Sequence, residues 1–191
     1  MIKFFFDKVL SILVLVLLFP AFILICILMK IKMPKEPVFF IQNRVGKEGK
    51  LFPMLKFRTM SVGHNGSSIS VAGESRITKF GAILRRYKVD ELPALWNVLK
   101  GEMSFVGPRP DVPGYADKLE GENRKILKLR PGITGPASLK YSNEEEILSL
   151  QKEPIKYNDE VIYPDKVKIN LEYYYTRSFI GDIKVIINTI F

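Results

Sequence analysis

A continuous apolar segment opens the chain. Between Val9 and Met29 the only side chain that is not apolar is Ser11. As a helix this segment would be roughly 31 Å long, at about 1.5 Å per residue, which is enough to cross the hydrocarbon core of a bilayer. Pro20 lies in the middle, where it removes a backbone donor and clashes with the preceding turn, so we expect a break or bend there. The pattern predicts a membrane helix over residues 1–32.

Basic residues flank this segment on both sides. Lys3 and Lys8 precede it, and Lys30, Lys32 and Lys35 follow it, so the positive-inside bias gives no clear direction. A cleaved signal peptide is disfavoured, because the apolar run is longer than a typical h-region and no small-residue cleavage site follows. A helix that spans the membrane and a re-entrant helix that enters and leaves by the same face remain equally open from the residues alone.

Shorter patterns follow the apolar segment. Residues 38–41 and 50–52 look like two short strands on either side of a glycine-bounded turn over residues 46–49, which predicts a short β-hairpin. Residues 61–75 are rich in Ser and Gly and predict a mobile loop.

Two helices are predicted next. Apolar side chains recur at helical spacing over residues 80–87 and again over 92–99. Asp90 stands where the N-cap of the second helix belongs, Pro93 is compatible with a first turn, and Gly101 closes the end.

Breakers divide the remainder of the chain. The segment Gly107-Pro108-Arg109-Pro110 predicts a loop, because residues before proline avoid the helical region. Residues 130–136 predict a second rigid loop whose glycines let backbone amides approach a ligand. The stretch 143–160 is acidic and polar, and it contains Glu144-Glu145-Glu146, a rival acidic site that we interpret as a solvated face because it lies away from the basic clusters. At the C-terminus Asp182 would cap an isoleucine-rich helix, for which a membrane interface and burial against the core are both open.

Composition narrows the function classes. A chain of 191 residues has room for one ordinary domain, and 47% apolar residues suffice for a core. Its single cysteine, Cys26, and single histidine, His64, argue against a disulfide framework and a structural zinc site. The net charge is +9, and the first 140 residues carry 23 Lys/Arg against 11 Asp/Glu. This excess predicts an anionic partner: nucleic acid, lipid headgroups or a phosphorylated substrate.

Basic residues lie next to glycine, proline, threonine or one another in four clusters. These are Lys56 and Arg58, Arg85 and Arg86, Arg109 between two prolines, and Arg130 before Pro131. The guanidinium fork suits phosphate oxygens. Each cluster alone is better explained by a solvated face or a salt bridge, but the four together favour a diphosphate ligand.

Asp90 and Glu91 are the only adjacent carboxylates among these basic clusters. They can be an N-cap with a first-turn acid, which stabilises the helix. They can also be a nucleophile that attacks phosphorus and a ligand of a divalent cation, since Mg²⁺ prefers one or two carboxylates plus substrate phosphates. A carboxylate nucleophile would need no histidine base, because it is ionised at neutral pH.

Three blocks of sequence form a known pattern. They are Lys56-Phe57-Arg58-Thr59-Met60, the block VDELPALWNVLKGEMSFVGPRP over residues 89–110, and Arg130-Pro131-Gly132-Ile133-Thr134-Gly135. Together they resemble the bacterial sugar transferases, specifically the small monotopic phosphoglycosyl transferases. The resemblance runs from the apolar segment to about residue 140 and continues weakly to the end.

The resemblance implies a membrane enzyme that transfers a sugar 1-phosphate from a UDP-sugar to a polyprenyl phosphate such as undecaprenyl phosphate, releasing UMP. It implies a ping-pong mechanism with Asp90 as nucleophile and Glu91 beside it, both at a Mg²⁺ site. Lys56, Arg85 and Arg109 match the family's phosphate-binding residues. Arg58 and Arg130 are added from the local chemistry, and Thr134 is counted with the substrate-binding residues.

The resemblance also implies a fold and a location. We expect an α+β, mostly helical protein with a re-entrant membrane helix over residues 1–32 broken at Pro20. The remainder, residues 33–191, would be a cytosolic catalytic domain with interfacial amphipathic helices and a short β-hairpin, on the cytoplasmic face of the bacterial inner membrane. Phe19-Pro20 departs from the family's Ser-Pro break, so the bend depends more on proline. Without the extra membrane helices of larger members, the chain would be a minimal catalytic unit.

Two other function classes remain. A membrane-tethered nucleic-acid binder is compatible with the basic charge, but no recognition motif accompanies it, and we expect no nucleic-acid partner. A catalytically silent scaffold of the same fold would be distinguished by loss of the carboxylate pair, which this chain keeps. The sequence does not name the sugar, the glycan or the oligomeric state, and we expect residues 61–75 and 111–160 to choose the sugar.

Overall fold

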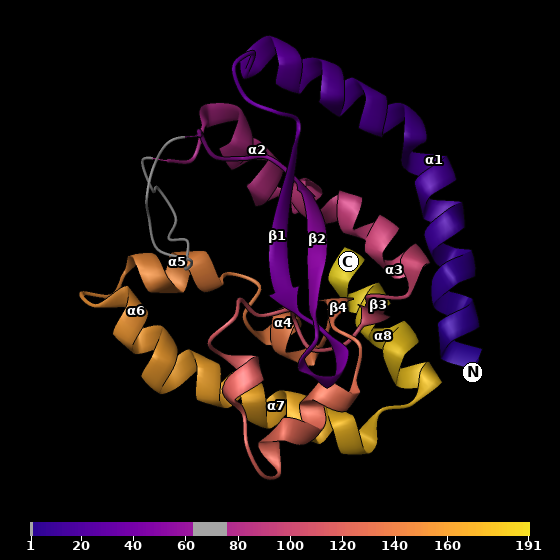
Figure 1. Ribbon diagram of the computed structural model, residues 1–191, viewed down its shortest axis with the longest axis vertical. Coiled ribbons are helices and arrows are strands. Elements are labelled where there is room, and N and C mark those ends of the chain that lie inside the picture. Colours follow the sequence, from indigo (N-terminus) through magenta and orange to yellow (C-terminus); the bar gives the residue numbers. More distant parts are fainter. Residues whose placement is uncertain (1, 63–75) are drawn as a thin grey trace. The chain divides into compact units, whose positions relative to one another are not determined.

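The computed structural model describes residues 2–62 and 76–191. It is mostly helical with a short β-hairpin and one long apolar N-terminal helix (Figure 1), which confirms the α+β class. The chain divides into two compact units. The first holds residues 2–42, 53–62 and 76–101, and the second holds residues 43–52 and 102–191. The loop predicted over residues 61–75 lies, from residue 63 on, outside the described residues.

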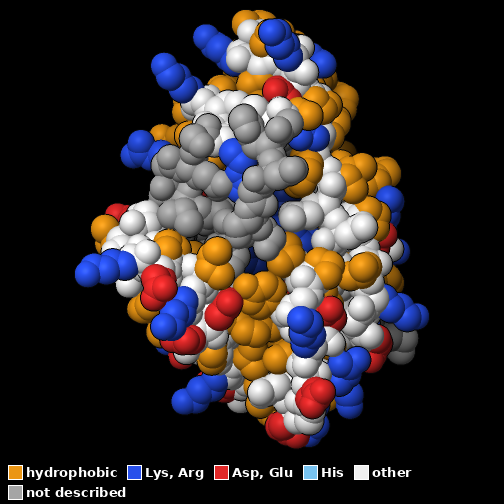
Figure 2. All heavy atoms as spheres, turned by 60° about the vertical axis from the view of Figure 1, so that its left-hand side comes forward, with side chains coloured by type: hydrophobic (Ala, Val, Ile, Leu, Met, Phe, Trp, Pro, Cys, Tyr) orange, Lys and Arg blue, Asp and Glu red, His pale blue; other side chains and the backbone are white. Residues whose placement is uncertain are grey.

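The apolar segment forms one helix, α1, from Ile2 to Lys32, with Pro20 inside it. Its ribbon changes direction between its two ends and remains helical (Figure 1). The helix is long and apolar enough to cross a membrane by length and composition. Figure 2 shows Lys and Arg side chains projecting from the end of the molecule where α1 finishes, and Lys30 and Lys32 are exposed there. Entry and exit by one membrane face stays a prediction.

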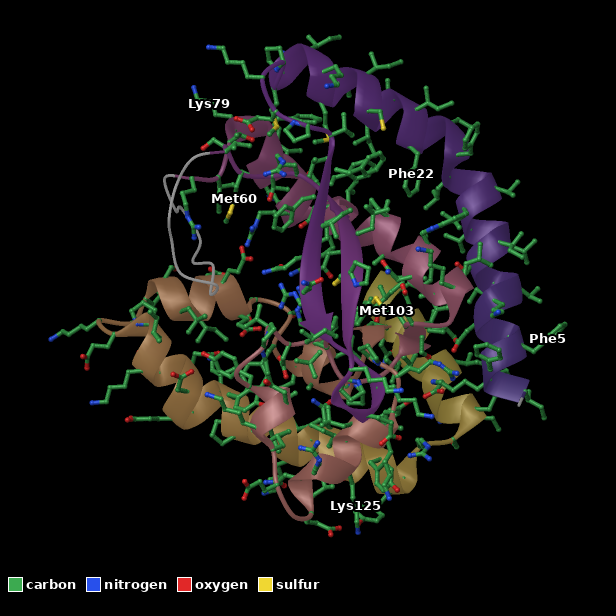
Figure 3. All side chains as sticks on the ribbon, in the orientation of Figure 1. Phe5, Phe22, Met60, Lys79, Met103 and Lys125 are labelled. Atoms are coloured by element: carbon green, nitrogen blue, oxygen red, sulfur yellow. The ribbon has the colours of Figure 1, made fainter. Side chains whose placement is uncertain are left out.

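The hairpin is confirmed and is longer than predicted. Strand β1 runs from Phe39 to Val45 and β2 from Leu51 to Phe57, with the 3-10 turn η1, Lys47–Gly49, between them. Phe57 ends β2 almost fully buried, with its ring 5.5 Å from that of Phe22 in α1. Figure 3 shows Phe22 pointing from α1 toward the hairpin, while Phe5 points away from it. The aromatic contact fixes the middle of α1 against the strand.

Both predicted helices of the first unit are present. Helix α2 is Lys79–Arg86, capped by the Thr78 hydroxyl, which accepts a hydrogen bond from the Gly81 amide at 2.9 Å. The second consists of a 3-10 turn, η2, Val89–Ala94, followed by α3, Leu95–Lys100. Gly101 ends α3 with a φ of 86°, as expected of a C-terminal glycine.

The interpretation of Asp90 as an N-cap is wrong. Lys88 precedes η2 in the left-handed conformation, with a φ of 55°, and Asp90 lies inside the turn that follows. Neither Lys88 nor Ala94, the residues at the two N-cap positions, makes a side-chain capping bond. The chain therefore starts this element by a backbone turn, and the Asp90 side chain has no capping role there.

The second unit contains a strand pair that the sequence patterns do not predict. Strand β3, Ser104–Val106, pairs in parallel with β4, Gly132–Thr134, and Ser104 aligns with Gly132. The remaining elements of this unit are η3 Ala116–Lys118, η4 Asn123–Lys128, α4 Pro136–Lys140, α5 Glu144–Ser149, α6 Pro154–Tyr157, the π-helical turn η5 Asn158–Ile162, α7 Tyr163–Thr176 and α8 Phe179–Ile190.

Glycines bring the two proline-rich loops into direct contact. A Cβ on Gly107 would lie 2.3 Å from the Arg130 carbonyl oxygen, and one on Gly135 would lie 2.3 Å from the Gly107 carbonyl oxygen. Of these two, Gly135 was expected to let backbone amides approach a ligand. Instead the space beside each is filled by the other loop's backbone, so any side chain there would force the loops apart.

The C-terminal helix is capped differently from the prediction. Ser178 is the N-cap of α8, and its hydroxyl accepts a hydrogen bond from the Gly181 amide. Asp182 is instead buried and accepts a hydrogen bond of 2.5 Å from the Tyr173 hydroxyl of α7. The bond ties α8 to α7, and it leaves Ile180 and Ile190 exposed on the outer side of α8.

Candidate active site

An ion pair joins the hairpin to the carboxylate turn of the first unit. The Lys56 Nζ of β2 lies 2.9 Å from Glu91 Oε1 of η2, and the two side chains are only 12% and 11% exposed. An ion pair so far removed from water is strong enough to fix both side chains. Lys56 and Glu91, both named from the sequence, therefore form one local site.

Asp90 lies beside this pair and is 9% exposed. The 3-10 turn that carries it is held by Pro93 and Ala94, which are both buried. A carboxylate is seldom so far removed from water without a specific reason. The position suits a reactive group that is held rigidly and screened from solvent.

Asn97 is a supporting residue that the sequence analysis missed. Its side-chain oxygen accepts a hydrogen bond from the Leu55 amide at 3.1 Å, and its nitrogen donates to the Pro53 carbonyl at 2.9 Å. Because Lys56 follows Leu55 in β2, this clamp sets the position of Lys56 relative to α3. An asparagine among the apolar residues 95–99 was the available signal in the sequence.

Two arginines named from the sequence lie in the same unit. Arg58 directly follows β2, its guanidinium lies 5.1 Å from the centre of the Phe40 ring, and its buried Nε has no hydrogen-bond partner among the described residues. Arg85 is half-buried in the last turn of α2. Helix α2 contacts η2, the turn that carries Asp90. A buried guanidinium donor without a partner is expensive and suits a site for an anion.

The N-terminal half of α1 docks on α3 through polar side chains. Ser11 is fully buried, and its hydroxyl donates a hydrogen bond of 2.7 Å to the backbone carbonyl of Leu95, the first residue of α3. Asp7, one helical turn earlier, is also buried. The single polar residue of the apolar run therefore faces protein, next to the turn that carries Asp90 and Glu91.

The other residues named from the sequence belong to the second unit. Arg109 follows β3 and Arg130 precedes β4, and both are half-buried. Thr134 ends β4, is buried, and shares a hydrogen bond of 2.7 Å with the Thr189 hydroxyl of α8. The loops of Arg109 and Arg130 lie side by side because the Gly132 amide donates a hydrogen bond of 2.8 Å to the Pro108 carbonyl.

Asp111 is a half-buried carboxylate that the sequence analysis did not name. Burial raises its pKa to about 6, while Lys166, Arg44 and Arg109 oppose this rise and Glu144 adds to it. The carboxylate makes no hydrogen bond or ion pair with any described residue. Its position two residues after Arg109 was the available signal.

The donor set suits a magnesium ion shared with substrate better than a closed metal site. Among residues 2–62 and 76–191 no group of three or more His, Cys, Asp and Glu side chains could hold a metal ion. Asp90 and Glu91 are two adjacent carboxylates, and Mg²⁺ is commonly bound by one or two carboxylates with substrate phosphates completing its shell. The residues present therefore fit a magnesium site that is completed by a diphosphate.

A family model and several known proteins are similar to this chain. The family model described as Bacterial sugar transferase matches residues 1–191. A UDP-glucose:undecaprenyl-phosphate glucose-1-phosphate transferase of Xanthomonas campestris is 40% identical over 159 residues, 80% of this chain and 33% of that protein. An Escherichia coli protein of the same description is 36% identical, over 97% of this chain and 38% of its own length.

Shorter relatives are covered more fully. The uncharacterized sugar transferase EpsL of Bacillus subtilis is 36% identical over 81% of this chain and 69% of its own length. The chain spans only about a third to two fifths of the length of the first relatives that it matches.

Proposed function

This chain belongs to the bacterial sugar transferase family, and from that membership we propose that it transfers a sugar 1-phosphate from a UDP-sugar to undecaprenyl phosphate and releases UMP. Relatives carry names that specify this reaction with glucose and with N-acetylgalactosamine as the sugar. The reaction would be the first membrane step in building a bacterial glycoconjugate.

One observation carries the proposal: buried Asp90 lies beside the ion pair of Glu91 with Lys56. The three residues come from the blocks on which the resemblance rests. Asp90 is not the N-cap of its element, and its burial is compatible with a catalytic role. A rigid carboxylate beside cations is what attack on a diphosphate requires.

The proposed reaction has two steps at one phosphorus atom. A carboxylate oxygen of Asp90 attacks the sugar-bearing phosphorus of the UDP-sugar, the bond from that phosphorus to UMP breaks, and UMP leaves with its electron pair. An oxygen of undecaprenyl phosphate then attacks the same phosphorus, and the bond to Asp90 breaks. The carboxylate is restored, and undecaprenyl diphosphate sugar is the product.

The basic residues would stabilise charge during both steps. By the resemblance, Lys56, Arg85 and Arg109 are proposed to bind phosphate oxygens of the substrate, and Arg58 and Arg130 are proposed for the same role from their local chemistry. The Thr134 hydroxyl is hydrogen-bonded to the Thr189 hydroxyl, so Thr134 would contribute to substrate binding by fixing the shape of the loop. Asp90 and Glu91 would hold Mg²⁺, which when bound neutralises negative charge on the diphosphate.

We also propose that α1 anchors the enzyme at the cytoplasmic face of the inner membrane as a re-entrant helix. Support comes from its length and apolar composition, from Pro20 inside it, and from lysines at both ends. Its N-terminal half is fixed to α3 by Ser11. The helix would therefore hold the carboxylate turn close to the lipid substrate.

Single-turnover chemistry tests the mechanism. Purified protein given a reactive UDP-sugar and Mg²⁺, without polyprenyl phosphate, should release up to about one equivalent of UMP and gain the mass of one sugar phosphate on the peptide containing Asp90. Adding undecaprenyl phosphate should discharge the adduct. If UMP appears only when both substrates are present, transfer is direct and the covalent intermediate is wrong. If no UDP-sugar yields UMP under either condition, the proposed activity itself is wrong.

A further inference from the structure

The Arg109 loop is held in place by β1. The Arg44 Nη1 donates a hydrogen bond of 3.1 Å to the Pro110 carbonyl, and the Val45 amide donates one of 2.9 Å to the Asp111 carbonyl. Both bonds use backbone atoms of the loop, so they fix its course without occupying the Asp111 carboxylate. Pro110 further restricts Arg109 to an extended conformation. The segment that carries Arg109 and Asp111 is thus rigid.

Basic groups surround the Asp111 carboxylate without pairing with it. Arg44, Arg109 and Lys166 lie close enough to lower the pKa of Asp111, and no hydrogen bond or ion pair joins the Asp111 carboxylate to a described residue. Lys166 is engaged elsewhere, with its Nζ 2.5 Å from Glu144 Oε2. A carboxylate that served only to stabilise the fold would be expected to contact one of these cations.

A second polar group in this cluster also has no hydrogen-bond partner. The Tyr163 hydroxyl is buried and forms no hydrogen bond with any described residue, and the Asp111 charge contributes to the rise of its pKa. The Tyr163 ring packs edge-on against Tyr115, with 5.0 Å between ring centres, so the hydroxyl is held in place. An acceptor and a hydroxyl thus remain available beside three cations.

We propose that Asp111 binds a hydroxyl group of the UDP-sugar, so that it is a substrate-binding and specificity residue. This inference rests on the proposed function. A UDP-sugar carries hydroxyls on its sugar ring and on its ribose, each within a few bonds of the diphosphate, and a carboxylate is a good acceptor for such donors. Arg109, two residues earlier on the same rigid segment, would bind the diphosphate while Asp111 receives the hydroxyl.

The proposal explains why the carboxylate is kept in a costly position. The carboxylate is partly buried, and this burial disfavours its ionised form and raises its pKa. A bound hydroxyl would supply the missing hydrogen bond and favour the ionised form. Binding sites that hydrogen-bond a substrate hydroxyl reject analogues that lack it, because the buried partner is then left unsatisfied.

The test compares Asp111→Asn with Glu120→Gln, which removes an exposed carboxylate from the same unit. For Asp111→Asn we expect KM for the UDP-sugar, measured by UMP release, to rise at least about tenfold, the loss typical of a hydrogen bond to a charged group. Isothermal calorimetry should show a parallel loss of UDP-sugar affinity. The melting temperature should stay the same or rise, and Glu120→Gln should behave as wild type.

Deoxy substrates identify the hydroxyl. The affinity of wild-type protein should fall by about the same tenfold factor for one monodeoxy UDP-sugar, the one that lacks the bound hydroxyl. Asp111→Asn should bind this analogue and the parent UDP-sugar equally well. If the hydroxyl belongs to the ribose, the affinity for UMP also falls in Asp111→Asn, whereas a hydroxyl on the sugar ring leaves UMP affinity unchanged.

Either source supports the inference. It is overturned if wild-type protein is active and Asp111→Asn keeps its KM, its affinity and its discrimination between deoxy analogues within about twofold. It is also overturned if Asp111→Asn melts well below wild type and Asp111→Glu restores stability without affecting affinity, because Asp111 would then be structural. Wild-type protein that yields no UMP from any UDP-sugar instead contradicts the proposed function.

Discussion

At the scale of single residues, two explanations of the Asp90 side chain can be separated: helix capping and nucleophilic catalysis. Its position in η2, after a left-handed Lys88, removes the capping explanation that its place before an apolar helix suggested. Sequence patterns describe which residues precede a helix, but they do not reveal a 3-10 turn inserted between the candidate cap and the α-helix. Its role as a nucleophile, which the carboxylate pair suggested and the resemblance favours, stays a prediction.

Replacing Asp90 by Asn should abolish turnover and leave the fold intact. The amide has the same shape, and no capping bond is lost, so we expect a melting temperature near that of wild type. A neutral amide cannot displace UMP, and loss of a covalent nucleophile should lower turnover by several powers of ten. UMP release and thermal melting measure the two effects. More than about a tenth of wild-type turnover, a barrier change of only about 1.4 kcal/mol, would contradict the nucleophile role.

The ion pair between Lys56 and Glu91 should show coupling between the two side chains. Both are nearly buried, so removing one partner leaves the other charged and poorly solvated. We expect Lys56→Met to lower the free energy of unfolding by about 2 kcal/mol, and Glu91→Gln combined with it to recover part of that loss. A double-mutant cycle of urea unfolding measures the coupling. Additive effects would show that the pair is not coupled.

Asp111 should make stability depend on pH. Its pKa in the folded protein is raised from 3.8 to about 6, so ionisation is disfavoured in the folded state. Its contribution to stability is therefore most favourable below about pH 4, declines as pH rises toward 6, and is constant above. Asp111→Asn should remove this decline and be more stable at pH 7 by about 1 to 2 kcal/mol, a value reduced because the side chain is partly exposed. Urea unfolding at several pH values tests this, and equal stability throughout would contradict it.

At the scale of elements, local patterns predicted what depends on neighbours in sequence. The hairpin, α2 and the end of α3 at Gly101 follow from alternation, helical spacing and a terminal glycine. The pairing of β3 with β4 could not be predicted in this way. Each strand has only three residues, too few for a period to appear, and their register depends on glycines that let Gly107 and Gly132 approach each other.

The contact between α1 and α3 is another feature that depends on the fold. Sequence showed Ser11 as the one polar residue of an apolar run, but a hydroxyl in such a run can bond its own helix as readily as another. The structure places it against the Leu95 carbonyl. The polar side of α1 is thus defined by α3, while exposed residues such as Leu17 form its apolar surface.

Ser11→Ala should loosen the attachment of α1 to α3. The variant leaves a buried carbonyl without its hydrogen bond, which costs about 1 to 2 kcal/mol. We expect a lower melting temperature in detergent or nanodiscs, with faster hydrogen exchange at the start of α3. Ile12→Ala, at an exposed position of the same helix, is the matched control. Equal melting and exchange for the two variants would show that the Ser11 bond contributes nothing.

At the scale of the whole molecule, the position of the charges relative to α1 is what a membrane would recognise. Lysines flank the helix at both ends, and Lys30 and Lys32 are exposed where it finishes (Figure 2). Flanking lysines at both ends give the positive-inside bias no single direction and are compatible with both ends on the cytoplasmic side. A helix that spans the membrane would place one basic end in the periplasm. The two topologies therefore differ in an observable way.

Cysteine labelling in cells should decide the topology. Cys26 is the only cysteine, so a Cys26→Ser background permits single reporters at Lys3→Cys and Lys35→Cys. We expect both to react with a membrane-impermeant maleimide only after the inner membrane is opened, as a re-entrant helix requires. Pro20→Leu restores the missing backbone donor and favours a straight helix, so some molecules should then expose position 3 to the periplasm. If position 3 is labelled in intact spheroplasts while Pro20 is kept, α1 spans the membrane. The proposed anchoring by one face would then be wrong.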